Sequence, residues 1–465
     1  MKRVPMYARN GIVSFMLCCY LLFYGMWLSG VNSAYVYDYS NLLFPWIAVS
    51  MVLHLFCFIY VKKISIYDVG LWFLVLSYLF MYGFLFIDKF DMTILLLWAP
   101  IKSYNQTILF EATSFVNLCL NMFVLGYLNA NNIEKDHIFY TRVSKSYYSK
   151  DKYHTGILLC IIGGICHFIT SVKLVDVTQT AGDYLAYTEA SSTGIIDDIA
   201  FLFVPGIIYL LTSKRFSKTK ALMLTSVVIA YFSMIMLLSG SRKTQVFGIV
   251  AVVLCYLYTY RPPRFSLFKK VFIIFGGSVF LNMIYIIREY RNTLVEVIPA
   301  FFSSLTSFEF IKNVIPETLA ETGITFGSVA SVIKCVPDVF SYEYGLTLIR
   351  SIISILPIGW LIPEFFEKAA TTNTINKYLN LPVGGSLFAD FYWNWGVFGI
   401  IASLIFGIVL AVCSSNLQKK SKEVYFSLLY IVLIGVRAGM FELVRPLFIV
   451  IFVPWFIGYL IKRFK

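Results

Sequence analysis

The chain has 465 residues, of which 59% are hydrophobic and 14% are charged, whereas soluble proteins carry about 25% charged residues. Apolar runs recur from Gly11 to Ile461, and at about 20 residues each can cross a hydrocarbon core of about 30 Å. The composition therefore excludes a soluble enzyme and predicts a polytopic membrane protein. The net charge of +13 does not indicate nucleic-acid binding, because the basic residues fall in short segments between the apolar runs.

The apolar runs and the polar breaks between them predict about twelve membrane-spanning helices in an all-α fold. The first run follows the basic sequence MKRVPMYARN without a small-residue cleavage pattern, so we expect it to be a retained span rather than a signal peptide. In chain order, the expected spans lie near residues 11–32, 42–61, 66–87, 108–129, 155–175, 195–212, 221–239, 246–260, 270–287, 386–413, 424–441 and 445–461.

Basic residues are distributed unequally between the two sides of this predicted bundle. If the N-terminus is cytoplasmic, the inside segments contain 24 of the 38 Lys and Arg residues and only four acidic residues. Cytoplasmic loops of membrane proteins carry this excess of positive charge. The pattern therefore predicts a membrane protein of many spans, with both termini in the cytoplasm.

The predicted outside segment 288–385 is the longest break between spans. Its moderately apolar stretches are interrupted by charge or proline, which favours interfacial or re-entrant helices over ordinary spans. The expected organisation is a bundle over 1–287, a large periplasmic loop over 288–385, and a second bundle part over 386–465. No internal repeat is visible, which is evidence against a transporter built from two related halves.

Arginine recurs on the predicted outer side, where basic residues are normally depleted. Arg242 lies in the outer turn SGSRKT, Arg288 and Arg291 lie where the ninth span emerges, Arg437 lies within an apolar span, and Arg445 follows it. An intramembrane arginine is costly enough to suggest a function. Because the planar guanidinium suits phosphate oxygens, the cluster predicts a clamp for a lipid phosphate or pyrophosphate.

A structural role for these arginines is the alternative interpretation. One of them could pair with Glu442, Asp390 or Glu111 and hold the bundle together. The turn at Arg242 could likewise be a solvated hairpin that touches lipid headgroups.

Four sequence segments together resemble the O-antigen polysaccharide polymerase Wzy family. They are SGSRK at a span end, IREYRN before the long loop, ETGITFGSVASVIKCVPDVFSYEYGLTL within it, and GGSLFADFYWNWGVFGI at re-entry into the membrane. The match extends over roughly residues 190–450, whereas the first half matches only in hydropathy. At the re-entry motif the family would more often have Glu than Asp390.

The resemblance implies a glycosyltransferase with a bundle of the GT-C type. Its substrate would be an oligosaccharide repeat unit linked to undecaprenyl pyrophosphate at the periplasmic face of the inner membrane. The growing chain would be moved from its lipid carrier onto a new lipid-linked unit. Membrane lipid, a chain-length regulator and a flippase of the same pathway are the candidate partners, with no nucleic acid and no cofactor.

Such a transfer requires a general base and a stabilised leaving group. The four histidines lie in spans or in the basic inner loop, so we expect a carboxylate as the base. Glu321 in the sequence ETG is the first candidate and Asp390 the second, with Glu442 and Glu317 behind them. The arginines would bind the pyrophosphate.

Aromatic residues near the loop are candidates for stacking on sugars, although interfacial Tyr and Trp are also common in membrane proteins. The sugar-binding candidates are Tyr342, Tyr344 and Tyr392. No metal site is expected, because the adjacent Asp197 and Asp198 are better suited to pairing with arginine.

Two other functions are compatible with this hydropathy. A flippase of lipid-linked oligosaccharides would also have about twelve spans, but the long 288–385 loop favours the polymerase. An O-antigen ligase would share the bundle and the outer loop, but we would expect a histidine in that loop, and 288–385 contains none.

Overall fold

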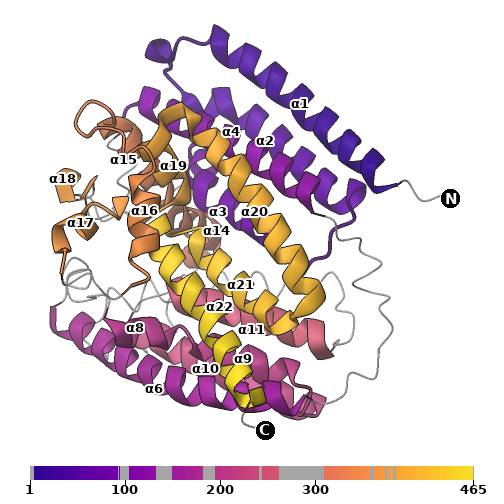
Figure 1. Cartoon of the computed structure of the whole chain (residues 1–465). Coiled ribbons are helices and arrows are strands. Elements are labelled where there is room, and N and C mark those ends of the chain that lie inside the picture. Colours follow the sequence, from indigo (N-terminus) through magenta and orange to yellow (C-terminus); the bar gives the residue numbers. More distant parts are fainter. Residues whose placement is uncertain are drawn as a thin grey trace.

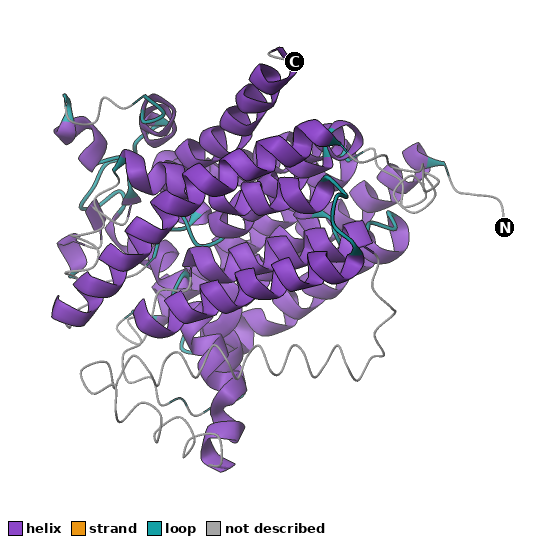
Figure 2. Cartoon of the chain, turned by 90° about the horizontal axis from the view of Figure 1, so that it is seen from below, coloured by secondary structure: helices purple, strands orange, loops and turns teal. Residues whose placement is uncertain are grey.

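The computed structural model describes residues 5–92, 94, 104–131, 149–181, 194–239, 243–260, 308–356, 361–371, 374–375, 377–380 and 384–463. In these ranges every regular element is a helix and none is a strand (Figure 2). Nine of the described helices are long and apolar enough to span a membrane. Of the other predicted spans, the one near 270–287 lies outside the described residues, and those near 246–260 and 424–441 form shorter helices.

The N-terminal group of helices lies together at the top of Figure 1. Asp38, Asp68 and Asn105 each cap the helix that follows by accepting a backbone N–H three residues on, as the preferred N-cap residues do. The group consists of α1 (Met6–Gly30), α2 (Tyr39–Phe56) with its π-helical extension η2 (Cys57–Val61), α3 (Val69–Lys89) and α4 (Gln106–Ala130).

A second group lies at the bottom of Figure 1, and the C-terminal helices run between the two groups. The second group comprises α6 (Lys150–Ala181), α8 (Ile195–Ala200), α9 (Phe203–Thr212), α10 (Lys218–Ser239) and α11 (Lys243–Tyr260). The C-terminal helices are α20 (Gly399–Lys420), α21 (Lys422–Gly435) and α22 (Met440–Arg463). Helix α20 packs along α4, where the Ser403 hydroxyl donates to the Cys119 carbonyl at 2.7 Å.

The described part of the segment 288–385 is also helical. It contains α14 (Phe308–Gly323), α15 (Phe326–Cys335), α16 (Leu346–Ile353), α17 (Pro363–Glu367) and α18 (Lys377–Leu379). Helix α14 packs on α3, and a Cβ on Gly83 would clash with the Leu319 carbonyl oxygen. Helix α15 is almost wholly buried against α4 and α19. Both helices are therefore part of the packed bundle.

The predicted span near 386–413 is divided into two helices. Helix α19 (Leu387–Trp395) ends at a short 3-10 turn, η5 (Gly396–Phe398), before α20 begins. Gly396 has φ of 55°, a left-handed conformation that favours glycine. A Cβ on Gly399 would lie 2.6 Å from the Phe391 carbonyl oxygen, so glycine allows α19 to fold back closely on α20.

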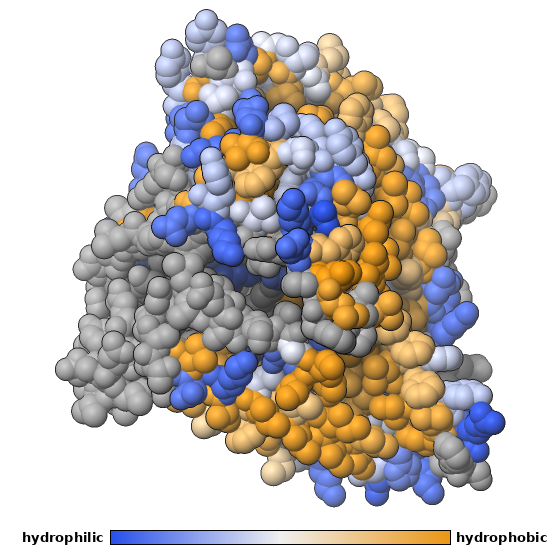
Figure 3. Space-filling model, turned by 60° about the vertical axis from the view of Figure 1, so that its left-hand side comes forward, coloured by the Kyte–Doolittle hydropathy of each residue, from blue (hydrophilic) through white to orange (hydrophobic). Residues whose placement is uncertain are grey.

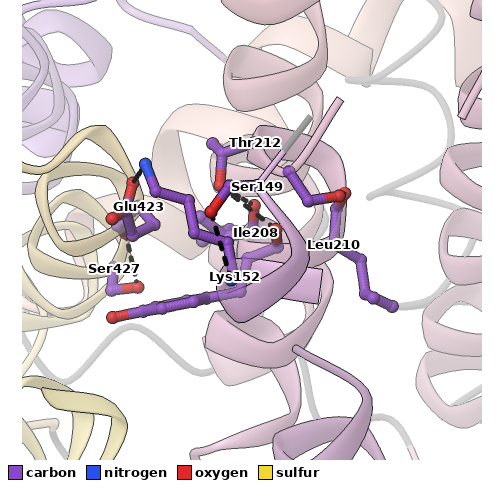
Figure 4. Close-up of polar contacts among 9 residues, drawn as sticks. Ser149, Lys152, Ile208, Leu210, Thr212, Glu423 and Ser427 are labelled. Atoms are coloured by element: carbon purple, nitrogen blue, oxygen red, sulfur yellow. Dashed lines mark hydrogen bonds and ion pairs between the residues drawn. The ribbon is translucent and has the colours of Figure 1, made fainter. Parts of the chain in front are cut away.

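Segments that the charge pattern assigns to the cytoplasmic side meet at one end of the bundle. Lys152 at the start of α6 forms an ion pair with Glu423 at the start of α21, with 2.7 Å between Nζ and Oε2 (Figure 4). The Ser149 N–H donates to the Ser213 carbonyl at 3.3 Å. The Lys62 ammonium donates to Asn10. These contacts join segments from five inter-helix connections or helix ends.

The segments assigned to the other side meet at the opposite end. Tyr39 donates its hydroxyl to Asp88 at 2.8 Å and its backbone N–H to Gln106 at 3.0 Å. Thr107 donates to the Ser33 carbonyl at 3.0 Å. The alternation of span directions expected from the sequence is therefore consistent with the way the described helix ends are paired.

Candidate functional site

The turn between α21 and α22 lies within the bundle, well short of the end of the bundle at which α20 begins. Helix α21 has 14 residues and α20 has 22, which at 1.5 Å per residue correspond to about 21 and 33 Å. Only Ser421 separates the end of α20 from the start of α21, so these two helix ends lie at the same end of the bundle. The turn 436–439 therefore lies roughly 12 Å below the far end of α20. The hydropathy of the sequence predicts a continuous helix around Arg437, but the structure places this residue in the turn.

A second segment, residues 384–386, lies at the same depth in the bundle as the α21–α22 turn. Residues 384–386 precede α19, which runs back toward the far end of α20. A Cβ on Gly385 would lie 2.6 Å from the backbone nitrogen of Gly439, and one on Gly384 would lie 3.8 Å from Arg437 Nε. Gly385 thus allows this segment to meet the α21–α22 turn, backbone against backbone, whereas the space at Gly384 would admit a Cβ.

Asp390, in the first turn of α19, links this segment to the start of α22 through its side chain. Its side chain accepts a hydrogen bond from the Thr371 hydroxyl through Oδ1 and from the Met440 N–H through Oδ2, the latter at 2.5 Å. The residue is 1% exposed. A buried carboxylate with both oxygens engaged therefore holds together α19, the segment at Thr371 and the first residue of α22.

Arg437 is partly buried beside this contact. The ion pairs between described residues do not include its guanidinium. A positive charge at this depth without a carboxylate partner in the described chain is costly, and such charges usually mark a substrate or ion site. The geometry favours binding of an anionic group by its planar fork of donors.

Arg445 has a carboxylate partner. Its Nη2 lies 2.5 Å from Asp198 Oδ2, and the side chains are 18% and 11% exposed. The pair ties α22 to α8. This is the structural arrangement that the sequence left open, and the partner is Asp198, one of the two adjacent aspartates that the sequence indicated as suited to pairing with arginine. Arg242, Arg288 and Arg291 lie outside the described residues.

The three tyrosines singled out from the sequence form one cluster. The ring centroids of Tyr342 and Tyr344 are 6.2 Å apart, and those of Tyr342 and Tyr392 are 6.5 Å apart. Tyr344 is 77% exposed. The Tyr344 N–H donates to the Asn394 carbonyl at 3.0 Å and the Gly345 N–H to the Asn394 side chain at 2.9 Å. The cluster is therefore held at the C-terminal end of α19.

Glu321 is partly buried in the last turn of α14, and Glu317 lies one turn earlier. The main packing partner of α14 is α3, whereas Asp390 and Arg437 lie where α19 meets the α21–α22 turn. The contacts of α14 thus do not by themselves bring the first base candidate to the arginine.

No pattern in the sequence indicates that Arg350 and Thr371 belong to this region. Arg350 Nη1 lies 2.5 Å from Glu343 Oε2 and also donates to the Lys368 carbonyl at 3.3 Å, which ties α16 to the end of α17. Thr371 meets Asp390 across 19 positions of sequence. Neither Arg350 nor Thr371 lies in a recognisable sequence motif. The adjacent glycines 384–385 are the one local signal that two segments approach each other closely in this region.

The face that carries α16 to α18 has both polar and apolar surface. On the side that carries α16 to α18, hydrophilic residues gather around a hollow, and hydrophobic surface extends below and beside it (Figure 3). Large apolar side chains such as Phe15, Met26, Phe168 and Met223 are exposed on the outside of the bundle. Exposed apolar side chains of this kind are typical of a lipid-facing exterior.

The fold and the site define a polytopic membrane protein whose interior presents a cation without an acidic partner among the described residues. The family model for O-antigen polysaccharide polymerase Wzy matches residues 12–465, and the chain belongs to this family. No curated protein and no solved structure matches the chain. The protein is therefore a multi-pass inner-membrane O-antigen polymerase of lipopolysaccharide biosynthesis, which acts on lipid-linked oligosaccharide repeat units.

Proposed function

We propose that the protein elongates O-antigen at the periplasmic face of the membrane, using repeat units linked to undecaprenyl pyrophosphate. The growing chain is transferred from its carrier to a new lipid-linked unit. The observation that supports this proposal is the position of Arg437. It lies in the turn between α21 and α22, within the bundle, and faces the segment with Gly384 and Gly385. A membrane-embedded cation is suited to the diphosphate of a lipid carrier.

The periplasmic location of the site follows from the orientation that we propose for the chain. Positive charge is concentrated in the segments at the end opposite to the site. Arg437, the tyrosine cluster and α16 belong to the other end. Both termini are then cytoplasmic.

Cysteine labelling tests this orientation. The native Cys335 is 1% exposed and cannot serve as the reporter, whereas Tyr344 is 77% exposed. In a background without other exposed cysteines, we expect Tyr344→Cys to react with a membrane-impermeant maleimide in intact spheroplasts. Lys419→Cys, at the exposed end of α20, should react only after permeabilisation. The reverse result would contradict the orientation and the periplasmic site.

In the proposed reaction, Arg437 binds the pyrophosphate of the donor. As the bond between the sugar anomeric carbon and the pyrophosphate oxygen breaks, the negative charge on the leaving group grows. A preorganised guanidinium at that position stabilises this charge more than it stabilises the substrate. Arg242, Arg288 and Arg291 are proposed as further ligands of the two lipid-linked pyrophosphates, and Arg445 contributes by holding α22 in place.

The acceptor hydroxyl must lose its proton as it attacks the anomeric carbon. We propose that Glu321 accepts this proton, while undecaprenyl pyrophosphate departs bound to arginine. Tyr342, Tyr344 and Tyr392 offer adjacent ring faces beside the site and are proposed to support the sugars of the incoming unit. The bundle is expected to be of the GT-C type.

Purified protein in liposomes provides the direct test. With lipid-linked repeat units as the only substrate, we expect a ladder of longer lipid-linked chains. Movement of a labelled unit between leaflets without elongation would instead indicate a flippase. In a parallel reaction to which lipid A core is added, transfer of units to the core without any ladder on the lipid carrier would indicate a ligase. A chain-length regulator and a flippase of the same pathway are proposed partners, and neither should be needed for elongation in this assay.

Glu321→Gln tests the proposed base. The amide keeps the size of the side chain but cannot accept the proton, so the elongation rate should fall about 10²- to 10⁴-fold. Glu317→Gln, one turn earlier on the same helix, is the matched control and should retain most of the rate. Near-normal elongation by Glu321→Gln would exclude it as the base.

A further inference from the structure

The contact between Asp390 and the start of α22 is the most constrained polar contact near the site. We infer that Asp390 is a positioning residue, which fixes the turn that carries Arg437, and that it is not the proton acceptor. This inference rests on the proposed function, because it assigns a role toward the arginine that binds the pyrophosphate. It differs from the prediction made from the sequence, which names Asp390 as the second candidate for the general base.

The carboxylate of Asp390 is directed toward the protein's own donors. Oδ1 accepts from the Thr371 hydroxyl and Oδ2 from the Met440 N–H. At 1% exposure, the side chain is enclosed by these partners. A general base must come within hydrogen-bond reach of the proton that it removes. A buried carboxylate whose two oxygens are both hydrogen-bonded to the protein is suited to holding segments in place rather than to removing a substrate proton.

The Met440 N–H is one of the N-terminal amides of α22 that have no partner within the helix. A carboxylate at this position satisfies the amide and also interacts favourably with the positive end of the helix dipole. Arg437 is only three residues earlier, in a turn whose other end is fixed by the end of α21. The Asp390 contact therefore sets where the guanidinium lies.

Two glycines make the contact sterically possible. A Cβ on Gly439 would lie 2.7 Å from Asp390 Oδ2, and one on Gly385 would lie 2.6 Å from the Gly439 backbone nitrogen. Contacts of this length are not tolerated without movement of one partner. A methyl group at Gly439 should therefore displace the carboxylate from Met440 even though Asp390 is still present.

The experiment compares Asp390→Asn with Asp390→Ala. Asparagine retains an oxygen that can accept from Met440 and an amide that can donate to the Thr371 hydroxyl, but it has no basicity. We expect Asp390→Asn to lower the elongation rate less than tenfold and to leave its pH profile unchanged. Asp390→Ala leaves the amide without an acceptor and should raise KM for the lipid-linked donor about 10- to 100-fold.

Gly439→Ala is a second variant that does not remove the carboxylate. We expect it to raise KM as Asp390→Ala does, and the double variant should be no worse than either single variant because both break one contact. Membrane abundance and thermal unfolding of each protein are measured in parallel. If Asp390→Ala does not accumulate, the Asp390→Asn and Gly439→Ala results decide the matter.

The outcomes separate this inference from the proposed function. If Asp390→Asn is as inactive as Arg437→Ala while it is folded, Asp390 acts in proton transfer and the positioning role is wrong. Normal kinetics of Gly439→Ala would likewise overturn it. If instead Arg437→Ala elongates normally, the proposed pyrophosphate site itself falls, whatever the Asp390 variants do.

Discussion

Arg437→Ala is expected to lower the rate of O-antigen elongation by at least about 100-fold, the usual effect of removing one preorganised donor from a developing negative charge. The guanidinium belongs to the turn between α21 and α22, which lies within the bundle, and it is beside Gly384. It has no acidic partner among the described residues. Its removal should therefore leave no unpaired carboxylate, and the protein should still accumulate in the membrane. The measurement is elongation of lipid-linked units by purified protein, with the O-antigen ladder in cells as a second assay.

Arg437→Lys sharpens this experiment. Lysine keeps the charge but cannot form two parallel hydrogen bonds to a phosphate, so we expect only a small recovery. Arg463→Ala is the matched control, because Arg463 is an exposed arginine in the last turn of α22, the helix that follows the turn with Arg437. Full activity of Arg437→Lys would show that positive charge alone suffices and that a bidentate contact is not used.

Arg445→Ala is expected to act mainly on stability. Removal of one partner from a largely buried ion pair leaves the other charge without compensation, which typically costs about 3–5 kcal/mol. Here the charge left behind is Asp198, whose side chain is 11% exposed. We expect a lower unfolding temperature in detergent and reduced abundance in membranes, with a loss of polymer that follows the loss of protein.

The double variant Arg445→Gln with Asp198→Asn separates the two interpretations of Arg445. A neutral pair can keep a hydrogen bond between α22 and α8 without a buried charge, so stability should recover. If Arg445 is structural, elongation per folded molecule should recover as well. If stability recovers but elongation does not, Arg445 contacts the pyrophosphate, as the sequence analysis predicted.

Much of the membrane architecture could be predicted from local sequence. Helices α1 to α4 begin and end within a few residues of the apolar runs because hydrophobicity along about 20 consecutive residues is itself the property that makes a span. The family could also be recognised from short motifs such as GGSLFAD and IREYRN, and the match over residues 12–465 confirmed it. In the same way, the concentration of lysine and arginine in alternate connections is visible without any structure.

The breaks within apolar runs could not be predicted in this way. Hydropathy does not distinguish a continuous helix from α19, η5 and α20, because the break depends on Gly396 at positive φ and on Gly399 against Phe391. Likewise, α21 ends at Gly435 in the middle of an apolar stretch. These breaks decide that Arg437 lies in a turn, and they arise from packing between helices rather than from composition.

The sequence by itself determined the class of protein, its family and the residue types available for pyrophosphate binding. Tertiary structure alone decided which partner each charged group has: Asp198 pairs with Arg445, Asp390 accepts hydrogen bonds from Thr371 and Met440, and Arg437 meets no carboxylate among the described residues. The physical reason is the distance along the sequence over which each kind of interaction acts. Helix formation depends on neighbours within a few positions, whereas the partner of a buried charge is set by how distant segments pack, and only that packing separates a structural arginine from one that can bind substrate.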